Sequence, residues 1–201
     1  MNSLSNKLSK ADMLLRVQDL LSIFIVPRFE KYNAVKFRNG EIITNRIINN
    51  FSTEKMLIIR SSAADEDLHT SSLAGEYASV LNIPSNNPEK IREGIKTVIN
   101  SYEKKRPLLP DDEVIIQEMV HDSTMSGVIF THDLNTGAPY YVINYDDQSG
   151  LTDTVTSGGG EYSNRTLYVH RNSISKLHSE RFTKILQAVQ ELEQVMETQF
   201  L

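Results

Sequence analysis

An arginine closes an apolar run near residue 60 and is followed by small hydroxyl residues. Residues 58–76 read IIRSSAADEDLHTSSLAGE, in which Arg60 precedes Ser61 and Ser62. A guanidinium at the end of a strand, followed by small residues with accessible backbone N–H groups, can converge on the oxygens of a phosphate. The alternative is a surface arginine paired with a nearby carboxylate, and the residues alone leave both open; the acidic candidates are Asp65, Glu66 and Asp67.

A second apolar run, IIQEMV at residues 115–120, is interrupted by Gln117 and Glu118. A flat aromatic base binds in an apolar slot with backbone groups along its edge, and the end of a strand supplies both. On the residues alone, an amphipathic edge strand whose polar residues face water is the more common arrangement. This run is nevertheless the candidate for binding a base.

A third stretch, DDQSGLTDTVTSGGG at residues 146–160, combines glycines with carboxylates in a β-rich region. Glycine lets a backbone approach a ligand closely, and Asp146, Asp147 and Asp153 could contact a ribose or the shell of a metal ion. A flexible hairpin loop is the simpler interpretation of the same residues.

The composition argues against several other chemistries. The chain has 201 residues, no cysteine and a formal net charge of −5, so neither a thiolate site nor a nucleic-acid-binding surface is expected. It contains no G-x-x-x-x-G-K-[ST], G-x-G-x-x-G or H-E-x-x-H motif, and its five histidines have no metal-ligand spacing, so no metal-binding residue is assigned. An apolar run long enough to span a membrane and a secretory signal are both missing, so we expect a cytoplasmic protein with no membrane partner.

Hydrophobic periodicity predicts an α+β fold that positions these segments. Apolar residues repeating at three and four predict helices over residues 10–25, 88–105 and 180–201. Short β-branched or alternating runs predict strands over residues 56–60, 77–83, 113–120, 126–133, 139–146 and 166–171. The short gaps after residue 113 favour antiparallel neighbours. We expect two lobes, residues 1–110 and residues 111–201, with a mainly antiparallel sheet in the second lobe.

Taken in order, these segments resemble the N-terminal nucleotide-binding domain of the phosphoenolpyruvate synthase and pyruvate phosphate dikinase family, which has an ATP-grasp fold. The matching blocks, between about residues 56 and 170, read IIRSSAADEDLHTSSLAGEYASVLNI, EVIIQEMVHDSTMSGVIFTHDLNTG and SGLTDTVTSGGG. The corresponding family patterns are VRSSA…ED…S-x-AG…LNV, Q-x-MV…SGV-x-F-T-x-D…TG and GLGE-x-VVSG. The N-terminal LSKADML is similar to the family's GGKGANL but lacks its glycines. The resemblance implies a nucleotide bound between two lobes, with ATP and Mg²⁺ as cofactors.

The resemblance also implies roles for residues around the phosphates. Arg60 and Lys10 would be the catalytic residues that hold the β- and γ-phosphates of ATP. Ser71, Ala74 and Gly75 would belong to the loop that closes over these phosphates. Cations and backbone donors suit this task, because catalysis of phosphoryl transfer is mostly positioning and charge neutralisation.

Other implied roles concern the base, the ribose and the metal. Gln117, Glu118, Met119 and Val120 would form the hinge that binds adenine. Asp153 would lie on the ribose side, where the family has the glutamate of GLGE. The family's metal ligands follow a helix like residues 180–200 in a D-x-E…LQ-x-RP segment. We therefore expect this chain to be an ATP-binding fragment whose metal ligands lie beyond residue 201.

The activity implied by the resemblance is that of an ATP-dependent phosphotransferase of kinase or dikinase type. It would pass a phosphoryl group through a phosphohistidine on a separate domain of the same polypeptide to an acceptor domain and a small acceptor. The altered N-terminus and the YDDQSGLTD segment are similar to relatives encoded with capsular polysaccharide genes, which include an L-glutamine kinase. The acceptor would be the glutamine amide or a pyruvate-like group. The alternatives are an ATP-grasp carboxylate–amine ligase and a non-catalytic regulatory module that binds nucleotide.

Overall fold

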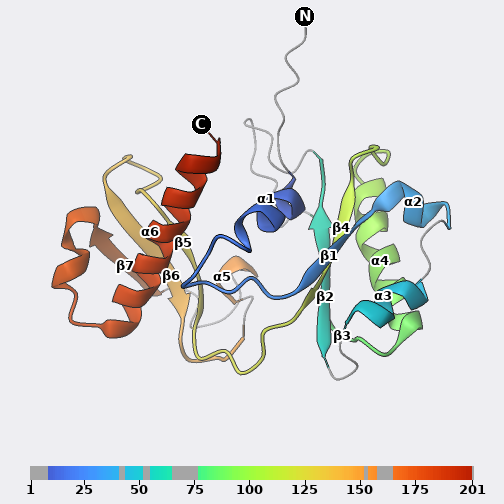
Figure 1. Cartoon of the computed structure of the whole chain (residues 1–201), viewed down its shortest axis with the longest axis horizontal. Helices are drawn as coiled ribbons and strands as arrows, with labels where there is room; N and C mark the ends of the chain where they lie inside the picture. The colour runs from blue at the N-terminus through green and yellow to red at the C-terminus, as the bar shows by residue number, and fades with distance from the viewer. Residues whose placement is uncertain are drawn as a thin grey trace, which may run out of the picture. The chain divides into compact units, whose positions relative to one another are not determined.

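The structure is a computed structural model (Figure 1) and describes residues 9–40, 44–51, 55–64, 77–151, 154–157 and 165–200, without the side chains of 44–46, 156–157 and 198–200. The chain divides into two compact units. Unit 1 comprises Met1–Asp19 and Val26–Met119, and unit 2 comprises Leu20–Ile25 and Val120–Leu201. Helices and antiparallel sheets occur in both units, which confirms the predicted α+β class. None of the helices described is long and apolar enough to cross a membrane.

Unit 1 is built on a four-stranded antiparallel sheet in the order β1-β4-β2-β3. The central strands β4 and β2 are hydrogen-bonded on both sides. Figure 1 shows α4 on one side of this sheet and α1 on the other. In chain order the elements are α1 (Lys10–Val17), β1 (Phe29–Asn33), α2 (Ala34–Arg38), α3 (Thr44–Asn50), β2 (Met56–Ser62), β3 (Ser79–Pro84), α4 (Pro88–Glu103) and β4 (Glu113–Glu118).

The face of the unit 1 sheet that α4 covers is apolar. Side chains alternate between the two faces of a strand, and Leu57, Ile59 and Ile116 on this face are fully buried. Burying one such side chain stabilises the fold by about 1.5–3 kcal/mol, so this layer anchors α4 on the sheet. The apolar stripe of α4 recurs at helical spacing and packs into the same core; its members are Ile91, Ile95, Val98, Ile99 and Tyr102.

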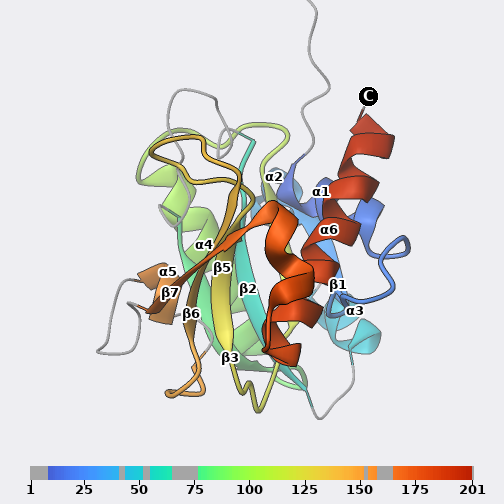
Figure 2. The ribbon, with the colours of Figure 1, turned by 90° about the vertical axis from the view of Figure 1, so that its left-hand side faces the viewer.

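Unit 2 contains a three-stranded antiparallel sheet in the order β5-β6-β7, with α6 along one face (Figure 2). Its elements are β5 (Ser126–Phe130), β6 (Tyr140–Asp146), α5 (Thr154–Ser157), β7 (Arg165–His170), the 3₁₀ helix η1 (Arg171–Lys176) and α6 (Glu180–Phe200). The side chains of Tyr141, Ile143 and Leu186 are central to the core between sheet and helix. Asp133 shapes the β5–β6 turn by accepting hydrogen bonds from the backbone N–H groups that follow it.

The first helix is shorter than the sequence predicts. The prediction of a helix over residues 10–25 is wrong beyond Val17, where α1 ends. The next apolar residues, Leu20–Ile25, belong to unit 2, and Phe24 packs against the unit 2 core. The Glu191 carboxylate accepts hydrogen bonds from the backbone N–H groups of Ser22 and Ile23, which ties this segment to α6. Phe24 therefore continues the apolar spacing of α1 in the sequence but packs in the core of unit 2.

The division between the units also differs from the predicted boundary at residue 110. It falls after Met119, because β4 pairs with β1 and β2 in the unit 1 sheet. The four antiparallel strands expected after residue 113 are thus one strand of unit 1 followed by the three strands of unit 2. β1 was not predicted, since Glu30 and Lys31 interrupt its apolar pattern.

Candidate functional site

Arg60 and Ser62 lie on the face of the unit 1 sheet opposite to α4. Ile59 packs against α4, so the side chains of Arg60 and Ser62 point to the other face. Along β4, Arg60 is paired with Ile115 and Ser62 with Glu113. Arg60 is partly exposed, whereas Ser62 is fully buried. The structure therefore presents an arginine from a central strand on a face that α4 does not cover.

The helix α1 brings Lys10 to the same face of the sheet. Ala11 is fully buried in a small apolar cluster with Ile115 of β4. Its backbone N–H donates a hydrogen bond to the Oγ atom of Ser62 at 3.3 Å. Lys10 is the first residue of α1 and directly precedes Ala11. The segments that carry Lys10 and Arg60 thus meet on one face of one sheet.

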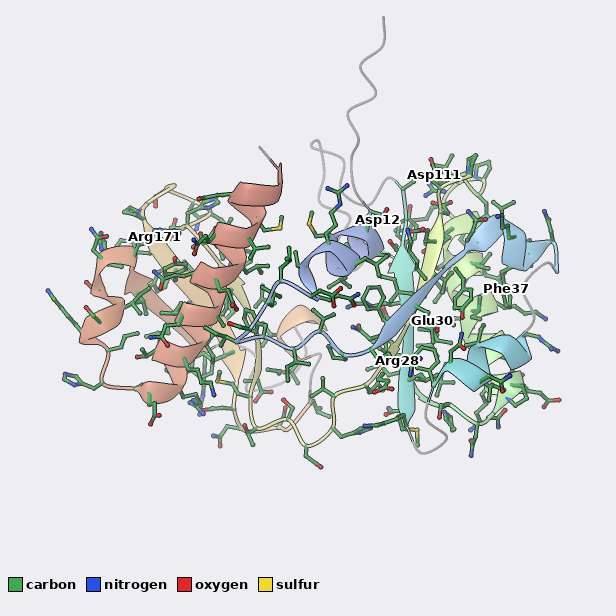
Figure 3. The ribbon with its side chains drawn as sticks, in the orientation of Figure 1. Asp12, Arg28, Glu30, Phe37, Asp111 and Arg171 are labelled. Carbon is green, nitrogen blue, oxygen red and sulfur yellow. The ribbon has the colours of Figure 1, made fainter. Side chains whose placement is uncertain are left out.

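Charged and hydroxyl side chains fix the first turn of α1 to the sheet. Ser9 Oγ accepts a hydrogen bond from the Asp12 N–H at 3.1 Å and donates to Glu113 at 2.8 Å. Lys31 of β1 donates to Asp12, labelled in Figure 3, at 2.6 Å and to Glu113 at 2.7 Å. Burial alone would raise the pKa of Asp12 and lower that of Lys31, but their hydrogen bonds and opposite charges reverse both shifts. The pKa of Asp12 is therefore below its ordinary value and that of Lys31 above it.

Buried residues also hold the end of β2. The Ser62 N–H donates a hydrogen bond to the Tyr102 hydroxyl at 3.0 Å, and this hydroxyl donates to the backbone carbonyl of Glu113 at 2.7 Å. Two residues further on, the Ala64 N–H donates to the Asp112 carboxylate at 3.1 Å. Tyr102 and Asp112 are both fully buried. The backbone that follows Arg60 is therefore held by side chains from α4 and from the segment before β4.

The predicted adenine hinge lies at the end of β4 and continues across the boundary between the units. Gln117 is buried, and its side-chain amide donates a hydrogen bond to the Pro27 carbonyl at 3.0 Å. The backbone N–H groups of Glu118 and Met119 bond to carbonyls of neighbouring segments in unit 1. Val120 is 56% exposed and begins unit 2. The Gln117 amide and the two N–H groups are thus engaged within unit 1.

Two of the acidic residues considered for ribose or metal contacts have partners within unit 2. Asp146 is buried and accepts hydrogen bonds from the hydroxyl groups of Ser149 and Thr154. The hydroxyl and the N–H group of Ser149 both donate hydrogen bonds to Asp146, and these bonds are the main reason why its pKa lies far below the ordinary value. Hydrogen bonds from the Gln148 N–H and the Thr154 hydroxyl lower this pKa further. Asp147 forms ion pairs with two arginine side chains later in the chain. Asp146 therefore shapes the loop after β6, and Asp147 ties this region to β7 and α6.

Several expectations fall on residues outside those that the structure describes. Among the predicted site residues these are Ser71, Ala74, Gly75 and Asp153, and the same holds for the acidic candidates at 65–67. Within the described ranges, no group of three or more histidine and acidic side chains could hold a metal ion. No metal ligand is therefore assigned among the residues that the structure describes.

Unit 2 also contains a cavity of about 530 Å³, lined by β5, β6, α6 and Phe24. Its lining is apolar apart from Thr131 and Glu193. Glu193 accepts hydrogen bonds from both Nη atoms of Arg171, labelled in Figure 3, at 2.8 and 2.9 Å, and from the Tyr141 hydroxyl at 2.6 Å. Phosphate binding needs cationic groups or N–H donors, and the lining of this cavity is apolar apart from a threonine and a carboxylate. The cavity is therefore not a candidate phosphate-binding site.

Most of the residues that hold α1 and the backbone after Arg60 in place were not predicted as site residues. Lys31 lies in the unpredicted strand β1, and Asp112 lies in a segment that reads as a connector. Tyr102 belongs to the apolar stripe of a predicted helix, and the sequence does not show which groups its hydroxyl would bond to. The only available signal was the serine pair after Arg60, because small hydroxyl residues at the end of a strand often make specific hydrogen bonds.

The chain matches a known protein family over most of its length. Residues 41–199 match the family described as pyruvate phosphate dikinase, AMP/ATP-binding domain. The chain therefore belongs to this family and is an ATP-binding domain of the phosphoenolpyruvate synthase and pyruvate phosphate dikinase class. The matched residues include Arg60 and begin after Lys10.

The chain is also similar to YvkC of Bacillus subtilis (strain 168), a protein named as an uncharacterised phosphotransferase. The two are 31% identical over a region that covers 52% of this chain and 13% of the relative. The similarity thus spans about an eighth of that longer protein.

Proposed function

We propose that the chain is an ATP-grasp domain in which Arg60 and Lys10 hold the β- and γ-phosphates of ATP. The observation that carries this proposal is the hydrogen bond from the Ala11 N–H to Ser62, which joins the start of α1 to β2 on the Arg60 face. A guanidinium and an ammonium group on one face can neutralise neighbouring phosphates, and the guanidinium can bind two oxygens at once. Membership of an AMP/ATP-binding family supports the same ligand.

In this proposal the end of β4 binds the base. Glu118, Met119 and Val120 line the adenine, and Gln117 supports them from within the sheet through its bond to the Pro27 carbonyl. The remaining roles rest on the family motifs, with Ser71, Ala74 and Gly75 over the phosphates and Asp153 on the ribose side.

The reaction we propose is transfer of an ATP phosphoryl group to a histidine on a separate domain of the same polypeptide, in the cytoplasm. The histidine nitrogen forms the new bond to phosphorus as the bond from phosphorus to the bridging oxygen breaks, and ADP leaves in a simple kinase. In a dikinase AMP leaves, and hydrolysis releases the other phosphate. A second transfer passes it to a small acceptor, either an amide such as that of L-glutamine or a pyruvate-like group. The name of YvkC as a phosphotransferase supports this class of reaction. Mg²⁺ accompanies the phosphates of ATP in such reactions and neutralises developing charge. We assign no described residue to it.

Calorimetric titration of the chain with ATP tests the role of Arg60. Arg60→Ala removes charge-assisted hydrogen bonds worth about 1.5–3 kcal/mol, so ATP affinity should fall on the order of 10- to 100-fold. Lys10→Met should also weaken ATP, and neither change should alter the affinity for adenosine, which has no phosphate. Arg92→Ala is the matched control, because Arg92 is exposed on α4, which covers the opposite face of the sheet.

Unchanged ATP affinity in Arg60→Ala would refute the phosphate role. The proposed transfer through a phosphohistidine is tested by incubating the polypeptide encoded by the complete gene with labelled ATP. A phosphohistidine intermediate gives an acid-labile phosphoprotein, and release of AMP together with phosphate distinguishes a dikinase from a kinase. A carboxylate–amine ligase would form an acyl phosphate on its substrate and leave the protein unlabelled. A regulatory module would bind nucleotide without turnover.

A further inference from the structure

Ser62 is the residue through which α1 and β2 are joined. Its hydroxyl accepts the Ala11 N–H at 3.3 Å, and its own N–H donates to the Tyr102 hydroxyl at 3.0 Å. Ser62 and Tyr102 are both fully buried. Lys10 precedes Ala11 by one residue, and Arg60 precedes Ser62 by two. The bond to Ala11 therefore helps to position Lys10, and the bond to Tyr102 helps to position the segment of β2 that carries Arg60.

The cross-strand partner of Ser62 provides the second attachment of α1. Ser62 and Glu113 are directly opposed on β2 and β4. The Glu113 carboxylate accepts hydrogen bonds from Ser9 at 2.8 Å and from Lys31 at 2.7 Å. The Tyr102 hydroxyl also links these two opposed residues, because it accepts the Ser62 N–H and donates to the Glu113 carbonyl. The first turn of α1 thus rests at two points on one pair of strand residues.

This arrangement restricts how Lys10 and Arg60 can move relative to each other. A buried hydrogen-bonded group shifts only if its partners shift or lose their bonds, which is costly away from water. Two charged groups that must bind neighbouring phosphates gain most when they are held in place before the ligand arrives. Ser62 itself is buried, so its contribution to a bound ligand has to pass through the elements it joins.

We infer that Ser62 is a positioning residue that couples the Lys10 end of α1 to the Arg60 end of β2, with Tyr102 as its support. The inference deepens the proposed function and rests on it. Ser62 contributes to ATP affinity through the placement of Lys10, and it makes no contact with the nucleotide. Its effect is confined to ligands with phosphates.

A double-mutant cycle tests this coupling by calorimetry with ATP and adenosine on the intact chain. Ser62→Ala should weaken ATP by about 3- to 10-fold, the range for loss of one neutral hydrogen bond, and leave adenosine affinity unchanged. In a Lys10→Met background the same substitution should have no further effect. Tyr102→Phe should reproduce the selective loss for ATP. Ser62→Thr retains the hydroxyl and should restore most of the affinity.

The matched control is Ser61→Ala. Ser61 is also buried, but its side chain lies on the α4 face of the sheet. This substitution can lower the melting temperature but should not change the ratio of ATP to adenosine affinity. Amide hydrogen exchange gives a second readout without nucleotide, because Ser62→Ala should speed exchange at the Ala11 N–H.

Three results would overturn the inference. These are unchanged ATP affinity in Ser62→Ala, an equal loss for ATP and adenosine, and a loss that adds fully to that of Lys10→Met. Unchanged exchange at the Ala11 N–H in Ser62→Ala would be a fourth such result. Failure of the proposed function gives a different pattern, since Arg60→Ala and Lys10→Met would then bind ATP normally.

Discussion

Replacing Asp112 with alanine should destabilise unit 1 by about 3–4 kcal/mol. Asp112 is fully buried and lies just before β4. Its carboxylate accepts hydrogen bonds from the Nη1 and Nη2 atoms of Arg106 at 2.7 and 2.8 Å. It also accepts the backbone N–H groups of Leu109 at 2.7 Å and Ala64 at 3.1 Å. One carboxylate just before β4 therefore joins the connector that follows α4 to the segment that follows β2.

The magnitude follows from what the substitution leaves behind. Removing one partner of a buried ion pair costs about 3–5 kcal/mol, because the other charge stays buried without compensation. The Arg106 side chain is 18% exposed, so water reaches part of the guanidinium and the lower half of this range applies. The N–H groups of Ala64 and Leu109 also lose their acceptor, and water entering the vacated space compensates them in part.

Urea unfolding followed by far-UV circular dichroism measures the effect, since the chain contains no tryptophan. Amide hydrogen exchange at Ala64 and Leu109 reports the local loss. The control is Asp111→Ala, because Asp111 is adjacent in sequence and exposed (Figure 3), and its substitution should change the free energy of unfolding by less than about 0.5 kcal/mol.

The Arg106→Ala/Asp112→Ala double variant should lose about 1–3 kcal/mol less than the sum of the two single variants, because no unpaired charge remains. Equal stability of Asp112→Ala and Asp111→Ala would show that the reasoning about the buried charge is wrong.

Two further predictions concern packing and pH. Burial and the hydrogen bond to Glu193 raise the pKa of Tyr141 from 10.0 to about 12. The neutral hydroxyl therefore stabilises the fold below pH 10, and about 2 kcal/mol of the free energy of unfolding is lost as the pH rises to 12. Tyr141→Phe should remove that alkaline loss in urea titrations at successive pH values, whereas Tyr140→Phe, at a more exposed neighbour, should retain it. Gly94→Ala should destabilise by about 1 kcal/mol, because a Cβ atom there would lie 2.5 Å from Ile83 Cδ1, which outweighs the gain in helix propensity. Glu93→Ala, on the exposed side of α4, should leave the melting temperature nearly unchanged in thermal unfolding. An equal loss of stability in Gly94→Ala and Glu93→Ala would contradict the predicted clash with Ile83.

Much of the secondary structure could be predicted because its signals are local. The stripe that predicts a helix over residues 88–105 corresponds to α4, and the final periodic stretch corresponds to α6. The β-branched runs correspond to β2, β5 and β6. β1 was missed because Glu30 and Lys31 interrupt its apolar pattern. The end of α1 was missed because Phe24 continues the apolar spacing but packs in the core of unit 2.

The candidate site was predicted only in part. The residues themselves pointed to Arg60 as a strand-end cation, and the resemblance added Lys10 at a helix start. Ser62, Tyr102 and Asp112, which hold these segments, could not be assigned from the sequence. A buried hydroxyl or carboxylate is recognisable only once its donors and acceptors are known, and those partners come from other elements.

Ordered motifs whose residue types suit a nucleotide identify the family from the sequence, and apolar patterns predict the longer helices α4 and α6 and every described strand except β1. Three features become visible only in the folded chain: α1 lies on the Arg60 face of the sheet, Gln117 is bonded to Pro27, and the division between units follows β4. The reason is physical. Which side chains meet across a sheet depends on strand order and register, and these are set by the packing of the whole unit.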